Sequence, residues 1–339
     1  MIDESKQTHQ RHNSSYSYMR YATAVYGDSM ISAAEMDVLG KWDNRLAPAT
    51  KTRISEHIGV PENDIVLMDV DYDGDVNHLR HFIAVDHANK KVVLAIRGTF
   101  SLSEVVVDVA AFSRPFCGGE AHSEMATMAE RVWEVAGETV NHSLKEHKDY
   151  EFIITGHSLG AAAACLLNII CHRNGKELIG GRKIRCFAYA TPPCYAPYEL
   201  AGEAAKDCIN HIHADDAVPF LSVDSVRHAF SSVLAIQEQN LGYWKRMRLL
   251  VGLDEPNERM IKAVQRASKK RLPAKAGAPI LVIPAAVTLW MREKEQIKGK
   301  YDIKICDSRR LPSLGIPIHS SMLQDHFPSS YEHALHNLE

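Results

Sequence analysis

The stretch that decides the fold is EFIITGHSLGAAAA, residues 151–164. Its first half is an apolar run, which predicts a buried strand, and its second half opens a helix at Ser158 with four consecutive alanines. Gly156 and Gly160 flank the serine and leave room for a sharp turn. The alanines allow the helix to pack closely on a sheet. The stretch therefore predicts a strand, a tight turn and a helix in direct succession.

The chain on either side continues this alternation of strands and helices. Short apolar runs predict further strands at residues 64–70, 81–86, 91–98, 183–190, 208–214, 280–284 and 302–306. Helical patterns cover most of residues 16–58, then 121–147 and 158–172. Strands separated by helices indicate an α/β fold, in which helices cover both faces of a mostly parallel sheet.

The domain organisation expected from these patterns is simple. Residues 1–15 are polar and are expected to be disordered. Residues 16–339 are expected to form a single domain that includes the N-terminal helices. The alternation lapses at about residues 225–275, where charged helical patterns predict a helical insertion in the fold.

Composition excludes few classes of function. The chain has 339 residues, 45% of them hydrophobic and 24% charged, with a net charge of −3, which excludes a strongly basic nucleic-acid binder. Its seven cysteines are odd in number and form no CxxC pair, which favours a reducing compartment. No HExxH motif or cysteine–histidine spacing indicates a metal, so we expect neither a metal nor a cofactor.

No targeting or membrane-spanning segment is expected. The first residues contain no apolar run of the kind found in secretory signals. The longest apolar stretch, residues 278–291, contains two prolines and is shorter than the roughly 20 residues that span a bilayer. A cytoplasmic location follows as the expectation, with any membrane contact peripheral.

Gly156-His157-Ser158-Leu159-Gly160 matches the G-x-S-x-G pattern of a nucleophile elbow, and it lies between a strand and a helix as that mechanism requires. A serine nucleophile needs a base that a carboxylate orients. Asp215 and Asp216 both follow the strand at 208–214, so either could be the acid. Chemistry alone leaves the base open among His228, His319, His326, His333 and His336.

The motifs, taken in order along the chain, resemble those of the fungal-type (class 3) lipase family, and most closely its sn-1-specific diacylglycerol lipase branch. The resemblance covers nearly the whole chain from Tyr16. It rests on Tyr18-Met19-Arg20-Tyr21-Ala22, Tyr26-Gly27, Ile96-Arg97-Gly98-Thr99, Ala121-His122, Gly156-His157-Ser158-Leu159-Gly160, Asp216-Ala217-Val218-Pro219 and Met322-Leu323-Gln324-Asp325-His326.

The resemblance implies an α/β-hydrolase fold and decides between the open alternatives. By position in the family's motifs, Asp216 is the expected acid and His326 the expected base for Ser158. Thr99 and the backbone amide of Leu159 are the expected donors to the oxyanion.

Residues 100–116 resemble the family's lid, a short helix that covers the active site in water. Val106 and Phe112 belong to its expected apolar face, and an ordinary buried helix is the alternative. Asp108 is open to two roles, a group that orients Thr99 or pairs with Arg97, or a plain surface acid. Residues 262–275 carry six basic residues and no acid, which fits either a membrane-surface helix or a solvated one.

The function that follows is hydrolysis of a fatty acyl ester in a glycerolipid, with diacylglycerol the substrate that the resemblance implies. The expected partner is a lipid at a membrane or lipid-droplet surface, with no nucleic acid. One alternative is a non-catalytic lipase-like scaffold, although such proteins usually lack a triad member. Another is an esterase that acts on phospholipid, monoacylglycerol or a small soluble ester.

Overall fold

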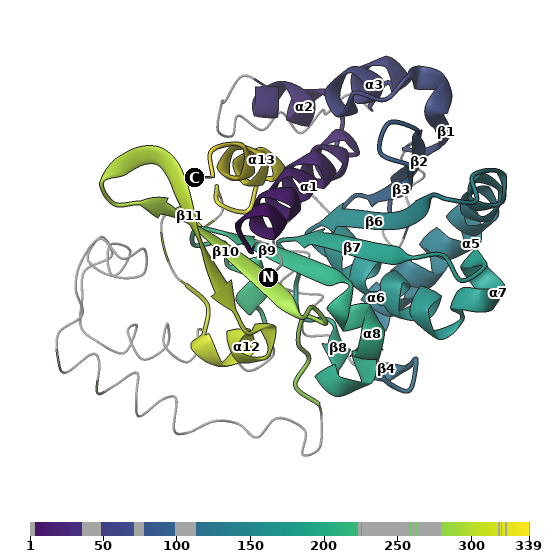
Figure 1. The fold of residues 1–339 in the computed structure, drawn as a ribbon. Coiled ribbons are helices and arrows are strands. Elements are labelled where there is room, and N and C mark those ends of the chain that lie inside the picture. Colours follow the sequence, from purple (N-terminus) through teal and green to yellow (C-terminus); the bar gives the residue numbers. More distant parts are fainter. Residues whose placement is uncertain are drawn as a thin grey trace.

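The computed structural model describes residues 4–35, 49–70, 78–98, 113–222, 225, 258, 262, 279–317, 319, 321–322 and 324–338, with side chains from residue 14 onward apart from 176–177. An eight-stranded sheet runs through the described part, with helices on both faces (Figure 1). In spatial order its strands are β1 (Ile65–Asp69), β2 (His81–Asp86), β3 (Lys91–Ile96), β6 (Glu151–His157), β7 (Ile184–Tyr189), β9 (Cys208–His213), β10 (Val287–Lys294) and β11 (Ile297–Cys306).

The centre of the sheet is parallel and its edges are antiparallel. β3, β6, β7, β9 and β10 pair in parallel, in that order. At one edge β1, β2 and β3 form antiparallel pairs, and at the other β10 and β11 do so. The predicted mostly parallel sheet is therefore confirmed. β6, which leads into Ser158, lies between β3 and β7 in the parallel part.

The helices divide between the two faces. On one face lie α5 (Ser123–Glu146), α6 (Leu159–Arg173), α7 (Gly175–Ile179) and α8 (Gly202–Lys206); on the other lie α1 (Glu4–Ala24), α2 (Asp28–Glu35), α3 (Lys51–Ile58) and α13 (Pro328–His336). The short α12 (Leu311–Leu314) follows β11. Phe152 and Ile154 of β6 pack toward α5 and α6, whereas Ile153 packs toward α1. Burial on both faces explains why this strand reads as a continuous apolar run.

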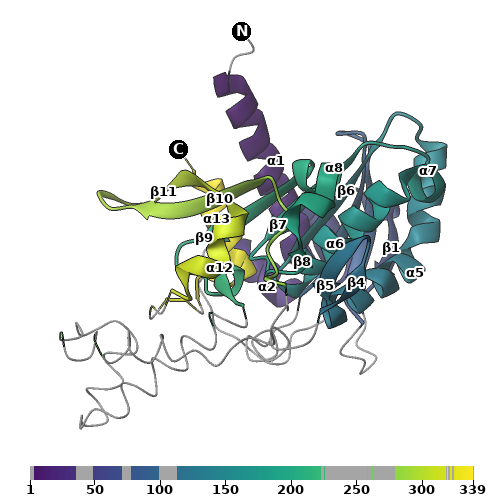
Figure 2. The same ribbon diagram turned by 90° about the horizontal axis from the view of Figure 1, so that it is seen from below.

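The N-terminus differs from the sequence-based expectation. α1 begins at Glu4, although residues 1–15 are expected to be disordered. The segment contains Glu, Lys, Gln and Arg, which favour helix despite their polarity. The first turns of this helix project beyond the sheet (Figure 2), while Tyr18, Met19 and Ala22 are buried against it.

Two other features of the sheets also differ. The predicted strand at residues 280–284 is only an isolated bridge from Val282 to Tyr195, because Pro279 and Pro284 bracket it and lack amide hydrogens. β10 follows instead at Val287, in a segment whose charges hide the strand pattern. A small second sheet consists of β4 (Ser113–Phe116), β5 (Gly119–His122) and β8 (Tyr195–Ala196), none of them predicted.

The expected insertion at 225–275 lies outside the described residues except for three isolated positions. Among the helices of the described ranges, none is both long enough and apolar enough to cross a membrane.

Candidate active site

Ser158 lies at the turn between β6 and α6, with φ 58° and ψ −127°. This conformation is strained for a residue with a side chain, and it persists because the turn is tightly enclosed. A Cβ on Gly156 would lie 2.4 Å from the Gly160 carbonyl oxygen, and one on Gly160 would lie 2.4 Å from the Ile96 carbonyl oxygen. Both flanking positions therefore require glycine, as the sequence motif predicts.

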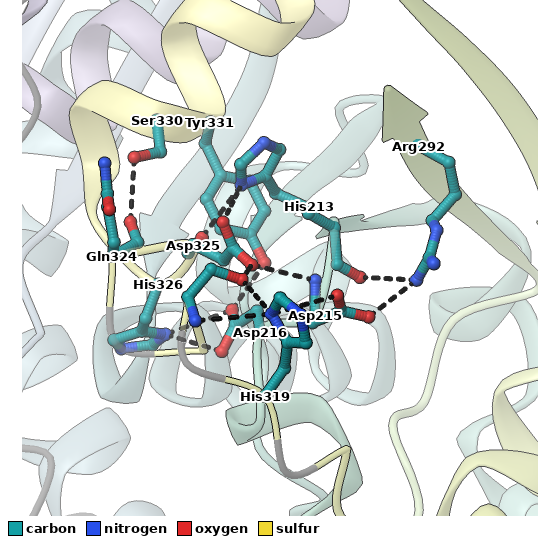
Figure 3. Close-up of polar contacts among 12 residues, drawn as sticks. His213, Asp215, Asp216, Arg292, His319, Gln324, Asp325, His326, Ser330 and Tyr331 are labelled. Atoms are coloured by element: carbon teal, nitrogen blue, oxygen red, sulfur yellow. Dashed lines mark hydrogen bonds and ion pairs between the residues drawn. The ribbon is translucent and has the colours of Figure 1, made fainter. Parts of the chain in front are cut away.

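The imidazole of His326 joins Ser158 to the carboxylate of Asp216, and Figure 3 shows the Asp216 side of this contact. Its Nε2 lies 3.0 Å from Ser158 Oγ, and its Nδ1 lies 3.0 Å from each Oδ atom of Asp216. These three side chains come from the turn after β6, the loop after β9 and the segment before α13. The structure thus brings together the three residues that the resemblance selects, in the geometry that an acid, a base and a nucleophile need.

Asp216 is held by two further donors. Its side chain is fully buried, and Oδ1 accepts a hydrogen bond of 2.9 Å from the Val218 amide. Oδ2 accepts one of 2.6 Å from the Tyr331 hydroxyl. Burial, reinforced by the adjacent Asp216, raises the pKa of Tyr331 far above its usual range, so this hydroxyl stays a donor. Sequence analysis missed Tyr331, because nothing in its local sequence announces contact with an aspartate 115 residues away.

Asp215 and His319 lie beside this site but are joined to other partners. Asp215 forms an ion pair of 2.8 Å with Arg292 of β10, and His319 Nδ1 lies 3.7 Å from its other carboxylate oxygen. His319 Nδ1 also lies 2.7 Å from Ser321 Oγ. Figure 3 shows both groups, with Arg292 on the side of Asp215 away from His326.

The other candidate bases do not join the site. His333 lies on α13 near Asn337, and the ring of His336 lies 5.2 Å from that of Tyr16. His228 lies outside the described residues.

A second hydrogen-bonded group anchors the backbone beside the serine. The Gly98 amide donates to the Tyr26 hydroxyl at 3.1 Å, and that hydroxyl lies 2.9 Å from His157 Nδ1. Burial, followed by the nearby His326, lowers the pKa of His157 well below its usual value, which keeps its ring neutral. A Cβ on Gly98 would lie 2.6 Å from the His157 carbonyl oxygen. The chain therefore passes very close to the serine just before Thr99.

Of the two expected oxyanion donors, only Leu159 lies in the described residues. Leu159 is the first residue of α6 and is buried, and the first amides of a helix have no acceptor within it. Thr99 lies outside the described residues, as do Val106, Asp108 and Phe112 of the expected lid. The end of that segment is corrected: residues 113–116 form β4 rather than lid helix, because they pair with β5.

Comparison with known proteins supports the expected family. The family model for lipase (class 3) matches residues 93–226, which contain Ser158 and Asp216. A mouse diacylglycerol lipase-beta is 27% identical over 48% of this chain, and the match covers 24% of the mouse protein. A secreted mono- and diacylglycerol lipase A of Penicillium cyclopium is 33% identical over 47% of this chain and 52% of its own length. The resemblance to class 3 lipases is thus confirmed, over part of each relative.

Solved structures show the same fold. A lipase of Rhizopus microsporus var. chinensis has a TM-score of 0.58 at 17% identity, over 94% of this chain and 86% of that one. The triacylglyceride lipase of Rhizomucor miehei also has a TM-score of 0.58, at 14% identity over 95% and 97% of the two chains. The α/β-hydrolase fold expected from the sequence is confirmed.

Proposed function

We propose that this chain, which carries a class 3 lipase segment, hydrolyses acyl ester bonds of glycerolipids with Ser158 as its nucleophile. One observation carries the proposal: His326 lies 3.0 Å from Ser158 Oγ through one ring nitrogen and 3.0 Å from Asp216 through the other. A serine, a histidine and a buried carboxylate in this order are the requirements for acyl transfer.

The reaction follows from these contacts. Ser158 Oγ attacks the ester carbonyl while His326 Nε2 takes its proton, and the Asp216 carboxylate stabilises the imidazolium that forms. His326 then gives the proton to the departing alcohol, which leaves an acyl group on Ser158. Water attacks that ester, with His326 again accepting a proton, and the fatty acid is released as Ser158 regains its hydrogen. Val218 and Tyr331 donate hydrogen bonds to the Asp216 carboxylate and hold it in place beside His326.

The negative charge that develops on the carbonyl oxygen needs donors that are fixed in advance. We assign the Leu159 amide to this role, because α6 begins there and the positive end of the helix faces the same point. Thr99 is the second proposed donor. The bonds that tie Gly98 to Tyr26 support this role, since they fix the backbone immediately before Thr99.

Diacylglycerol is the substrate we propose, because the mouse and Penicillium relatives carry that lipid in their names. Hydrolysis of a panel of tri-, di- and monoacylglycerols and phospholipids, each dispersed in the same way, measures the preference. A higher kcat/KM for a phospholipid than for diacylglycerol would contradict this assignment while leaving the serine mechanism intact.

The nucleophile is tested by Ser158→Ala, with Ser143→Ala as the matched control. Ser143 is also buried, but it lies on α5 and its Oγ donates to the Thr139 carbonyl. Wild type and Ser143→Ala should hydrolyse ester and react with a fluorophosphonate probe. Ser158→Ala should lose labelling and at least about 10⁴-fold in rate. Labelling of a folded Ser158→Ala protein would contradict the mechanism, and a wild type with neither activity would favour a non-catalytic scaffold.

A further inference from the structure

Three cysteines outside the proposed reaction meet in the core behind the sheet. Cys165 lies on α6, Cys186 on β7 and Cys208 on β9, and their sulfur atoms all lie within 4.8 Å of one another. The Cys165 and Cys208 sulfurs are 3.7 Å apart. Cys186 and Cys208 are direct partners in the parallel ladder of β7 and β9, so both side chains point to the same face, toward α6. We call this group the cysteine triad.

The triad is closed to solvent. All three residues are at most 1% exposed and belong to the apolar cluster between the sheet and α5, α6 and α8. Oxygen donors and water do not reach such a site easily, so its chemistry is that of sulfur. Within the described part of the chain, no other group of three potential ligands lies this close together.

The three thiols do not share their protons equally. Hydrogen bonding with Cys186 and Cys208 lowers the pKa of Cys165, although burial opposes this. Interaction with Cys165 raises the pKa of Cys208 and that of Cys186.

We propose that the cysteine triad binds one Cu(I) ion. A metal about 2.3 Å from each of three sulfurs lies at the centre of a triangle with edges of about 4 Å. The observed separations of 3.7 Å for one pair and at most 4.8 Å for the others need only small rotations of the side chains. Soft thiolate ligands favour Cu(I) and zinc among the common metal ions.

The number of ligands favours this ion. A structural zinc site takes four protein ligands, and the triad supplies three. Each Cu–S bond that forms replaces an S–H bond, because the thiolate is the metal ligand. The protons go to solvent, and no electron is transferred.

Copper transfer to the reduced protein tests the site directly. Without oxygen, the protein is titrated with the Cu(I) complex of bathocuproine disulfonate until the colour of the chelate stops changing. Wild type should take one equivalent of Cu(I). Cys165→Ala, Cys186→Ala and Cys208→Ala should each bind at least tenfold more weakly. Cys171→Ala is the matched control, since Cys171 is also buried on α6 but does not belong to the triad.

A second control removes the two partly exposed cysteines. The double variant with Cys117→Ala and Cys306→Ala should still bind one equivalent of Cu(I). Loss of copper binding in this variant would overturn the assignment. Copper X-ray absorption of the wild-type complex gives a result that needs no variant to fold. Three sulfur neighbours would support the triad. Nitrogen or oxygen neighbours, or uptake of less than one equivalent, would overturn it.

Discussion

Two aspartate–histidine pairs lie next to each other in this molecule, and only one of them contacts Ser158. The inner pair, Asp216 and His326, has side chains that are 0% and 12% exposed. The outer pair, Asp215 and His319, has side chains that are 26% and 54% exposed. An aspartate and a histidine thus pair twice in the same region, once buried beside Ser158 and once partly exposed. Surroundings, rather than residue type, decide which pair can act on the serine.

Hydrogen bonds join the segments of the outer pair to the residue that precedes His326. The Asp215 amide donates to the Asp325 carboxylate at 3.1 Å, and Ser321 Oγ donates to the same carboxylate at 2.6 Å. Asp325 immediately precedes His326, so these bonds tie the histidine loop to the loop after β9. Arg292 fixes Asp215 from the other side. We therefore expect the outer group to hold the loop of His326 in place and to take no part in proton transfer.

The largest expected difference is between the two histidines. His326→Ala removes the base and should lower kcat by about 10⁴- to 10⁶-fold. His319→Ala removes a partly exposed ring and should keep kcat within a few-fold of wild type. Ester hydrolysis by both purified variants measures this. Combining His326→Ala with Ser158→Ala should cost no more than either change alone, because the two side chains act as one unit. The reverse ranking of the two histidines would assign the reaction to the outer pair.

Substitution of the inner aspartate should also lower kcat far more than substitution of the outer one. Asp216→Asn keeps the shape of the side chain but offers an amide to His326 Nδ1, which disfavours the tautomer that can accept the serine proton. A loss of about 10⁴-fold in kcat is expected. Asp215→Asn loses the Arg292 ion pair, although its backbone amide still binds Asp325. Its kcat should stay within about tenfold of wild type, and equal losses in both variants would remove the distinction between the pairs.

Sequence analysis could predict the elbow but not the choice of partners. The strand, glycines and alanines around Ser158 are local, so their pattern is sufficient for β6, the turn and α6. Asp215 and Asp216 are chemically identical neighbours, and their difference arises from contacts with residues 77 to 115 positions away. Chemistry therefore left the acid and base open, and only the motif resemblance pointed to Asp216 and His326.

Local sequence was also insufficient to predict β10, near one edge of the sheet. The central strands are buried on both faces and read as apolar runs, whereas β10 and β11 alternate with charged residues and are partly exposed. Residues 302–306 of β11 are predicted as a strand, but β10 and the first half of β11 are not, and they become strands by pairing with β9 and with each other. The hydrogen bonds of Tyr26 and Tyr331 could not be predicted for a related reason, since a tyrosine shows its hydrogen-bond partner only in the folded state.

A smaller effect on kcat is expected from loss of the Tyr331 hydrogen bond that anchors Asp216. Besides His326, two groups donate hydrogen bonds to Asp216, and Tyr331→Phe removes one of them. The ring continues to fill the same buried space. A hydrogen bond to a charged group contributes about 1.5–3 kcal/mol, and part of that should appear in the rate. We expect kcat to fall by about tenfold, with KM nearly unchanged, because Tyr331 lies behind Ser158, His326 and Asp216. A rise in KM with unchanged kcat would point to a role in substrate binding.

The smallest effect concerns stability and pH at His213, which lies on β9 beside Asp325. Its Nδ1 lies 3.0 Å from the Asp325 carbonyl oxygen, and Tyr301, Tyr331, Asp216, Asp325 and His333 surround it. Burial lowers its pKa, although the Asp325 carbonyl and the two carboxylates oppose the shift.

Because the folded ring stays neutral below pH 6.5 while the unfolded one becomes charged, the unfolded state binds more protons there. Stability that His213 contributes above pH 6.5 is therefore lost as the pH falls from 6.5 toward its lowered pKa, by at most about 1.4 kcal/mol per pH unit. His213→Gln removes this dependence, so its urea unfolding free energy should decline less steeply than that of wild type between pH 6.5 and 5. His142→Gln, at a surface histidine that is 71% exposed, should leave the slope unchanged. Parallel slopes for wild type and His213→Gln would mean that folding does not lower the pKa of His213, and would contradict this prediction.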